Sequence, residues 1–352
     1  MKETSKTSML QTPTPEASAW SRSELAADPS WIFQLTPAQA QEVRAAVSAV
    51  NAKNLRAGEF GKEDFPLPTL AAVMPEIVRQ MEDGRGVVLI RGLPVNPVDD
   101  EDATKILWGI GTYLGRGLKQ TERVNLLNIK DNLVGHIIDQ GMDPNAVNAD
   151  RNRSNADLEP HCDPSDYVAL LCVRPALKGG VSHIVSSTRI YNELLEDQPE
   201  VLPALYSGFY HDLRGKGADG HEVTSRRIPV YTYYDGKLSC NHHPATVYTG
   251  AKKLGRELDP EEQAAMLAMR EAAEREDLKY EMDMRTGDLQ LLNNYTILHS
   301  RTDWVDAPEW ERKRLMLRLW LHNPASRSLP EGFVGGYVTE TKHDVAKQTR
   351  VL

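Results

Sequence analysis

The chain has 352 residues, of which 40% are hydrophobic and 26% are charged, and its formal net charge is −9. This composition is typical of a globular protein, and the length allows one large domain or two smaller ones. The acidic balance argues against a broad nucleic-acid interface and against binding to an anionic membrane surface, because both need clustered Lys and Arg.

The cysteine content and the N-terminus bear on the cellular compartment. Cys162, Cys172 and Cys240 cannot form a complete set of disulfides, and their spacing matches no zinc motif. The N-terminal stretch lacks the apolar region of a secretory signal, and no apolar run approaches the length of a membrane span. We therefore expect a cytoplasmic protein.

The first half of the chain is predicted to be mostly helical. Residues 1–28 are rich in Ser, Thr and Pro, so we expect a disordered N-terminal arm followed by a single domain over residues 29–352. Thr36 and Pro37 predict the start of a helix within 35–50. Apolar spacing and turn residues then predict helices in 69–83 and 99–115, and strands in 84–95 and 121–131.

Residues 131–158 are rich in Asn and Asp and show little hydrophobic periodicity. A loop of this length in a compact domain is usually functional or disordered. Because it leads directly to His161, we interpret it as a lid over an active site, with plain disorder as the alternative.

The second half of the chain is richer in strands. We expect helices in 187–208 and 258–277, the second of them capped by Asp259. A hairpin is predicted in 227–241 with its turn at Asp235 and Gly236. Strands are expected in 278–284, 287–300 and 313–322. Helices first and short strands later predict one α+β domain on an antiparallel sandwich or barrel.

The stretch EPHCDPSDYVALLCVRPALKGG, which begins at Glu159, places His161 and Asp163 two residues apart at the head of an apolar strand. Side chains at this spacing point to the same face of a strand, so the pair could be a metal site, a catalytic pair or a structural pair. His299 ends a later apolar strand and could meet them in a β-sandwich. Two imidazoles and one carboxylate suit a non-haem Fe(II) centre with three open positions, and zinc is the rival metal.

The strand predicted in 313–322 alternates between two kinds of side chain. Four leucines face one way, whereas Arg314, Met316, Arg318 and Trp320 face the other. The leucine face must pack on helices, so the second face carries two arginines into the interior of the barrel. Buried arginines need carboxylate partners, which either the protein or a ligand can supply.

The order His161-x-Asp163, Gly179-Gly180, His299 and Arg314-x-x-x-Arg318 resembles the TauD/TfdA family of Fe(II)- and 2-oxoglutarate-dependent dioxygenases, over roughly residues 85–325. The resemblance implies a double-stranded β-helix (jelly-roll) core with flanking helices. It implies Fe(II) held by His161, Asp163 and His299, with 2-oxoglutarate and O2 as co-substrates. Three further residues receive roles with it: Arg314 and Ser182 would bind the far carboxylate of 2-oxoglutarate, and Arg318 would bind an anionic group of the substrate.

The resemblance implies an enzyme that oxidises, most simply hydroxylates, a C–H bond of a small anionic or amino-acid-like molecule and releases succinate and CO2. We expect no nucleic-acid or membrane partner, and a homo-oligomer stays open by analogy with relatives. Two other classes also stay open: a zinc-dependent hydrolase or isomerase at the same three residues, and a non-catalytic jelly-roll that binds a small acid.

Other polar residues receive structural interpretations. His242 and His243 are adjacent and should point apart in a loop, where one of them could line the substrate pocket. We read His183 and Cys162 as structural, and His136 as solvated within the lid. Sheet hydrogen bonding is the simplest role for two asparagines that precede His299, namely Asn293 and Asn294.

Overall fold

The structure is a computed structural model that describes residues 8–120, 133–144, 146, 151–215 and 221–333. Its α-helices are α1 (Arg22–Ala27), α2 (Pro37–Ala52), α3 (Met74–Glu82), α4 (Asp100–Leu114), α5 (Ser187–Asp197), α6 (Leu202–Ser207), α7 (Pro244–Lys253) and α8 (Pro260–Glu274). Its strands are β1 (Ile32–Gln34), β2 (Val87–Arg91), β3 (Arg116–Leu118), β4 (Val134–Ile137), β5 (Leu158–His161), β6 (Tyr167–Arg174), β7 (Lys178–Gly179), β8 (Ser182–Ser186), β9 (Tyr231–Tyr234), β10 (Lys237–Cys240), β11 (Tyr280–Met282), β12 (Leu289–Asn293), β13 (Ile297–Arg301), β14 (Trp304–Val305) and β15 (Leu315–His322).

Two sheets form the centre of this α+β fold. The larger sheet has the order β1-β2-β12-β6-β15-β3, with β4 also paired to β15, and the smaller sheet has the order β11-β8-β13-β5. Only β1 and β2 run parallel within the described part of these sheets, and the remaining pairs are antiparallel. The expected α+β class with antiparallel sheets is confirmed.

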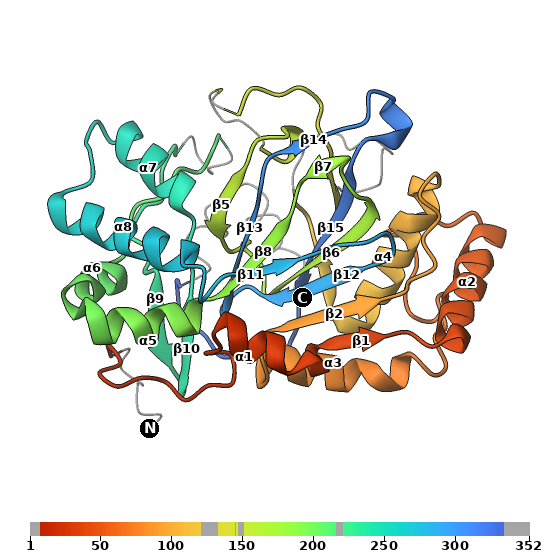
Figure 1. Cartoon of the computed structure of the whole chain (residues 1–352), viewed down its shortest axis with the longest axis horizontal. Coiled ribbons are helices and arrows are strands. Elements are labelled where there is room, and N and C mark those ends of the chain that lie inside the picture. Colours follow the sequence, from red (N-terminus) through yellow and green to blue (C-terminus); the bar gives the residue numbers. More distant parts are fainter. Residues whose placement is uncertain (1–7, 121–132, 145, 147–150, 216–220, 334–352) are drawn as a thin grey trace.

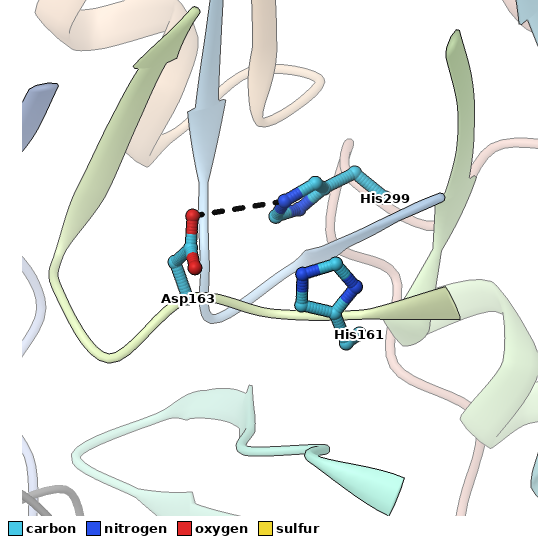
Figure 2. A group of neighbouring side chains, drawn as sticks. All are labelled: His161, Asp163 and His299. Carbon is cyan, nitrogen blue, oxygen red and sulfur yellow. Dashed lines mark ion pairs between the residues drawn. The ribbon is translucent and has the colours of Figure 1, made fainter. Parts of the chain in front are cut away.

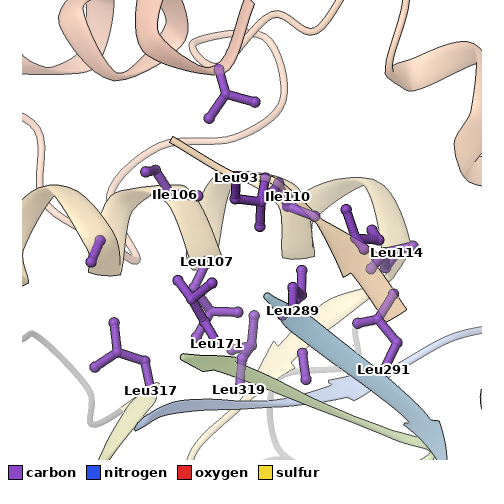
Figure 3. Close-up of a cluster of buried hydrophobic side chains, with 14 of the residues drawn as sticks. Leu93, Ile106, Leu107, Ile110, Leu114, Leu171, Leu289, Leu291, Leu317 and Leu319 are labelled. Carbon is purple, nitrogen blue, oxygen red and sulfur yellow. The ribbon is translucent and has the colours of Figure 1, made fainter. Parts of the chain in front are cut away.

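The apolar side chains divide into three clusters that define the layers. One cluster lies between the two sheets and joins residues such as Val168 and Met316 of the larger sheet to Ile184 and Ile297 of the smaller one. A second covers the other face of the larger sheet, where the leucines of β15 meet α4 (Figure 3). A third packs α5, α6 and α8 against the outer face of the smaller sheet. Figure 1 shows these helices at one end of the molecule and α2–α4 at the other.

Local signals in the sequence explain several of these elements. Thr36 caps α2 and Asp259 caps α8, each in a capping box with the residue three positions later, and each helix has Pro at its start. β9 and β10 form the expected hairpin, with positive φ angles of 52° at Asp235 and 78° at Gly236. These predictions are confirmed.

The expected disordered arm is wrong for residues 8–28. Residues 22–27 form α1, in which Leu25 is fully buried. The Trp20 side chain is buried too, and its indole N–H donates to the carbonyl of Arg85 at 2.8 Å. A few large apolar side chains therefore anchor a segment whose average composition is polar. Residues 1–7 lie outside the described part of the chain.

The segment 131–158 is not a continuous loop. Residues 134–137 form β4, which pairs with β15 and buries Val134 between the larger sheet and its helices. Four residues are too few for a strand pattern to stand out, and the pairing comes from backbone hydrogen bonds. The strand expected in 121–131, and residues 147–150 of the expected lid, lie outside the described residues. No helix in the described part of the chain is long and apolar enough to cross a membrane.

Candidate active site

Two strands of the smaller sheet bring His161, Asp163 and His299 together. His161 ends β5, and its Cα pairs in register with that of His299 in β13. The two imidazole rings lie 4.3 Å apart between centroids, and His299 Nε2 is 3.7 Å from the Asp163 carboxylate (Figure 2). One candidate ligand atom from each residue lies within 4.8 Å of the others. The grouping predicted from the sequence is therefore present in the fold.

Hydrogen bonds around these residues fix their orientation. His161 Nδ1 lies 2.9 Å from the carbonyl oxygen of Glu159. Because a carbonyl only accepts, this contact places the ring proton on Nδ1 and leaves the Nε2 lone pair for a metal. The backbone N–H of Asp163 donates to Asn294 Oδ1 at 3.0 Å, and Asn294 Nδ2 donates to the Ser165 carbonyl at 2.9 Å. Asn294 thus holds the turn that carries the carboxylate.

The electrostatics keep all three groups in the form that binds a metal. Burial lowers the pKa of His299 to about 3, and burial also lowers the pKa of His161. Burial alone would raise the pKa of Asp163, but the charges of Arg318 and the two histidines outweigh it and lower that pKa to about 2. At neutral pH the site therefore holds two neutral imidazoles and one carboxylate, the protonation state that metal coordination needs.

The donor set fits Fe(II). Two imidazole nitrogens and one carboxylate oxygen lie within 4.8 Å of one another, and this is the donor set of non-haem iron oxygenases. His299 Nδ1 is buried and has no hydrogen-bond partner among the described residues. Zinc can bind the same donors, so the three residues alone do not choose between the two metals.

Arg314 directly precedes β15, and its guanidinium forms no ion pair with an acidic residue in the described part of the chain. Its side chain is 4% exposed, and its Nη1 has no hydrogen-bond partner among the described residues. Burial lowers the pKa of its guanidinium to about 10, so the group is still a cation at neutral pH. An unpaired buried guanidinium is costly, and a bidentate carboxylate from a ligand would offset that cost.

The two glycines of the sequence motif make room for this arginine. Gly180 has a φ of 66°, and a Cβ atom at this position would lie 2.9 Å from Arg314 Nε. A Cβ atom at Gly179 would meet the carbonyl oxygen of Asp303 at 2.3 Å, where β7 pairs with β14. A side chain at either position would displace what lies beside it.

Arg318 has a different environment, because it pairs with the candidate metal ligand. Its Nη1 lies 3.1 Å from one carboxylate oxygen of Asp163 and 3.4 Å from the other. Its Nε donates to Gln120 Oε1 at 2.8 Å. In the structure the partner of Arg318 is therefore a protein carboxylate, that of Asp163. A role of Arg318 in substrate binding stays a proposal.

The remaining predicted residue, Ser182, lies in β8 directly opposite Arg301 of β13. Opposite residues of an antiparallel pair share a face, and Ile184 of the same strand faces the space between the sheets. Ser182 therefore lies on the same inner face as His299, and a role toward a ligand carboxylate stays a proposal. His183 faces the other way, with its Nε2 3.4 Å from Glu281, as its structural interpretation predicts.

His136 was expected to be solvated, and this expectation is wrong. It lies in β4, is 9% exposed, and neither ring nitrogen has a hydrogen-bond partner in the described part of the chain. Burial lowers its pKa to about 4.

His242 and His243 are both buried, and the first is 2% exposed. The Cys162 N–H donates to the His242 carbonyl at 3.0 Å, so the doublet runs beside the strand that carries the candidate ligands. His243 is the N-cap residue that precedes α7, and its Nε2 lies 3.9 Å from the buried Cys162 thiol. Among the described residues, neither belongs to the group of neighbouring ligand atoms formed by His161, Asp163 and His299.

Sequence reasoning missed three residues at the site. Gln120 contacts Arg318, as described above. Arg301 is two residues beyond His299 on β13, and Trp304 begins β14; both are buried beside Arg314. The spacing His299-x-Arg301 could have revealed the first of this pair, because it puts both side chains on one face of the strand.

Comparison with known proteins decides the family. A model of the taurine catabolism dioxygenase TauD, TfdA family matches residues 51–320. The chain belongs to this family. The match spans the candidate iron ligands and both arginines of the C-terminal strand, so the predicted TauD/TfdA membership, and with it the oxidoreductase class, is confirmed.

Relatives within the TauD/TfdA group extend over nearly the whole chain. The FR-33289 synthase of Streptomyces rubellomurinus (strain ATCC 31215) is 27% identical over 326 residues, covering 92% of this chain and 94% of the relative. The taurine hydroxylase-like protein SAT17 of Stachybotrys chartarum (strain CBS 109288 / IBT 7711) is 27% identical over 351 residues, covering 94% and 85%.

Solved structures of iron oxygenases share the fold. An asparagine oxygenase in complex with Fe(II), 3-hydroxyasparagine and succinate superposes with a TM-score of 0.63 and 16% identity, covering 83% of this chain and 93% of the other. The non-haem iron oxygenase OrfP in complex with Fe and α-ketoglutaric acid gives a TM-score of 0.57 and 16% identity, covering 82% and 93%. The iron and 2-oxoglutarate (α-ketoglutarate) expected from the sequence agree with what OrfP holds in its complex.

Proposed function

We propose that this chain is an Fe(II)- and 2-oxoglutarate-dependent dioxygenase that hydroxylates a C–H bond of a small anionic or amino-acid-like molecule and releases succinate and CO2. One observation supports this function above the others. A 2-His-1-carboxylate group and an unpaired buried arginine are contributed by strands of two facing sheets. The first can hold iron, and the second can hold the far end of a dicarboxylate co-substrate.

The two-sheet architecture supports the jelly-roll expected from the family. Opposing antiparallel sheets enclose an apolar layer, and helices cover their outer faces. In such a core, residues on inner strand faces converge, which is how His299, Ser182 and the arginines of β15 come to face one interior. A small ligand can therefore be contacted from both sheets at once.

The residues of this chain would divide the work. His161, Asp163 and His299 would hold the iron on one side and leave adjacent positions open. When bound, iron supplies the redox chemistry that couples decarboxylation of 2-oxoglutarate by O2 to oxidation of a C–H bond. Arg314, assisted by the Ser182 hydroxyl, would bind the far carboxylate and fix the position of the co-substrate. The charges of Asp163, Arg314 and Arg318 would then be balanced together with those of the metal, 2-oxoglutarate and an anionic substrate.

Arg318 motivates the anionic substrate. The guanidinium group has five donors, and its Nη2 has no hydrogen-bond partner among the described residues after Gln120 and Asp163 have taken Nε and Nη1. Once iron shares the Asp163 carboxylate, Arg318 would be free to turn more of its donors toward a substrate anion.

The three free cysteines support the expected cytoplasmic location.

The test is succinate formation from 2-oxoglutarate with Fe(II), ascorbate and O2, comparing wild type with His161→Ala. His183→Gln is the matched control, because that buried histidine lies on the same sheet but points away from the site. We expect succinate from wild type and from His183→Gln, and none from His161→Ala. Substrate turnover that requires zinc and proceeds without 2-oxoglutarate would support the hydrolase or isomerase, and ligand binding without O2 consumption would support the binding protein.

A further inference from the structure

Trp304 lies within cation–π distance of two buried guanidinium groups. The Cζ atom of Arg301 is 4.1 Å from the centroid of its ring system, and the Cζ atom of Arg314 is 4.8 Å from it. The exposed fraction is 2% for the tryptophan, 7% for Arg301 and 4% for Arg314. Each arginine is thus within the range of a cation–π contact, and such contacts are strongest where water is excluded.

The two cations need this ring. Arg301 and Arg314 are both buried, and burial disfavours a charged group that has no counter-ion. Neither guanidinium forms an ion pair with a described acidic residue. The electron-rich face of an indole stabilises a cation held against it.

Trp304 also limits where the Arg314 side chain can go. A Cβ atom at Gly180 would lie 3.1 Å from Arg314 Cδ and 3.3 Å from Trp304 Cβ. The stem of the arginine and the tryptophan side chain therefore both pack against the Gly180 backbone. A guanidinium held in this way loses less entropy when a carboxylate binds.

The tryptophan is itself held by a short segment before β5. Its backbone N–H donates to the Asn155 carbonyl at 3.1 Å, and Asn155 Nδ2 donates back to its carbonyl at 3.0 Å. Arg301 Nη2 donates to the carbonyls of Ser154, at 3.3 Å, and Ala156. Residues 154–156 lead directly into β5, which ends at His161, so one set of contacts links the tryptophan to the strand of a candidate iron ligand.

We propose that Trp304 is a positioning residue for the co-substrate subsite, which orients the Arg314 guanidinium toward the far carboxylate of 2-oxoglutarate. The proposal rests on the proposed function, because it presumes that Arg314 binds this carboxylate. It assigns no catalytic role to Trp304. It predicts that the residue matters for a 2-oxo acid with a far carboxylate and matters little for a 2-oxo acid without one.

The experiment compares the dissociation constants of 2-oxoglutarate and 2-oxobutanoate, which lacks the far carboxylate, on Fe(II)-loaded protein under anaerobic conditions. Trp304→Leu should weaken 2-oxoglutarate binding by roughly 2- to 30-fold and change 2-oxobutanoate binding by less than about twofold. Trp304→Phe keeps an aromatic face and should recover most of the lost affinity. Trp310→Leu is the matched control, because that exposed tryptophan has a similar contact with Lys313, at 5.2 Å, away from the site.

Three outcomes separate the claims. If Trp304→Leu weakens both 2-oxo acids equally, or neither, the positioning role is wrong. If wild type binds both acids equally and Arg314→Ala makes no difference, the assignment of the co-substrate subsite fails and the proposed function with it. If Trp304→Leu does not fold, Asn155→Ala replaces it, because it keeps the ring and removes its anchor; it should lower the preference for 2-oxoglutarate in the same direction, and an unchanged preference would overturn the proposal.

Discussion

Arg314 and Arg318 are four residues apart on the same side of one strand, yet their surroundings differ. The Arg314 guanidinium contacts the ring of Trp304, forms no ion pair with a described acidic residue, and has an Nη1 without a hydrogen-bond partner in the described structure. Arg318 already holds Asp163 and Gln120, and it too contacts a ring, that of Trp320, at 4.6 Å. A buried cation without a partner indicates a ligand anion that is missing from the protein itself. Arg318 is instead paired with a candidate metal ligand, so we expect its contact with Asp163 to change when a metal binds.

The largest expected effect separates the two arginines directly. Arg314→Ala should weaken 2-oxoglutarate binding by about 1.5–3 kcal/mol, roughly 10- to 150-fold, because it removes hydrogen bonds to a charged group. Arg318→Ala should change the same dissociation constant by less than about threefold, since its carboxylate partner is Asp163. Calorimetric titration of the Fe(II)-loaded variants measures both. Equal losses would mean that the two arginines share one anion, which contradicts the distinction.

A substitution at a glycine sharpens the comparison without replacing either arginine. Gly180→Ala places a Cβ atom against Arg314 and should weaken 2-oxoglutarate binding on the order of tenfold. Gly141→Ala is the matched control, because Gly141 has a similar φ of 72° but no neighbouring atom within 4 Å. Both variants should lose about 1–2 kcal/mol of folding stability from the positive φ. A loss of affinity in both would mean that the effect is strain and not contact with Arg314.

Removing Arg318 tests its competition with the metal. Arg318→Ala should bind Mn(II), a redox-stable substitute for Fe(II), more tightly by a factor of about three to ten, because a cation next to Asp163 opposes a second cation there. The release of bound Mn(II) is followed by electron paramagnetic resonance. Weaker Mn(II) binding in Arg318→Ala would show instead that the arginine holds the carboxylate in place for the metal.

The smallest effect concerns the other side of the same strand. His136 pairs with Leu317 of β15 and is buried as a neutral imidazole with its pKa lowered to about 4. Because its pKa is lower in the folded state than in the unfolded chain, it favours folding at pH 7 and loses that contribution as the pH falls from about 6.5 toward 4. His136→Leu should lack this loss and gain about 0.7 kcal/mol relative to wild type between pH 7 and pH 6.

Urea unfolding at both pH values measures this difference. His221→Leu, at an exposed position, is the control and should follow wild type. A pH dependence of the unfolding free energy that is identical in wild type and His136→Leu would mean that other buried groups account for the acid sensitivity.

The sequence predicted the parts of this site that depend on regular spacing. The alternation in 313–322 placed the leucines against helices and both arginines on the inner face, as the structure shows. The spacing of His161 and Asp163 indicated that the two belong to one group, but β5 ends at His161, so the strand rule applies to the histidine, whose register with His299 is observed, and not to Asp163 in the turn that follows. Such inferences hold because strand geometry fixes side-chain direction regardless of tertiary contacts.

Other parts depend on contacts between distant segments and could not be predicted. The Gly180–Arg314–Trp304 packing requires the pairing of β7 with β14, and each of these strands has only two residues. The N-terminal segment is ordered by single residues such as Trp20, whose partner Arg85 is far away in the sequence. The average composition of the N-terminal segment is polar, and it hides the few large apolar residues that anchor the segment. For this reason composition predicted disorder.

The most direct test of the account is an anaerobic titration of wild type and Arg314→Ala with Fe(II) and 2-oxoglutarate, followed by the visible charge-transfer absorption of the chelate. The account predicts that the band appears in wild type, is absent from His161→Ala, and needs a much higher 2-oxoglutarate concentration in Arg314→Ala. No band in iron-loaded wild type, or half-saturation at the same concentration in Arg314→Ala, would contradict it.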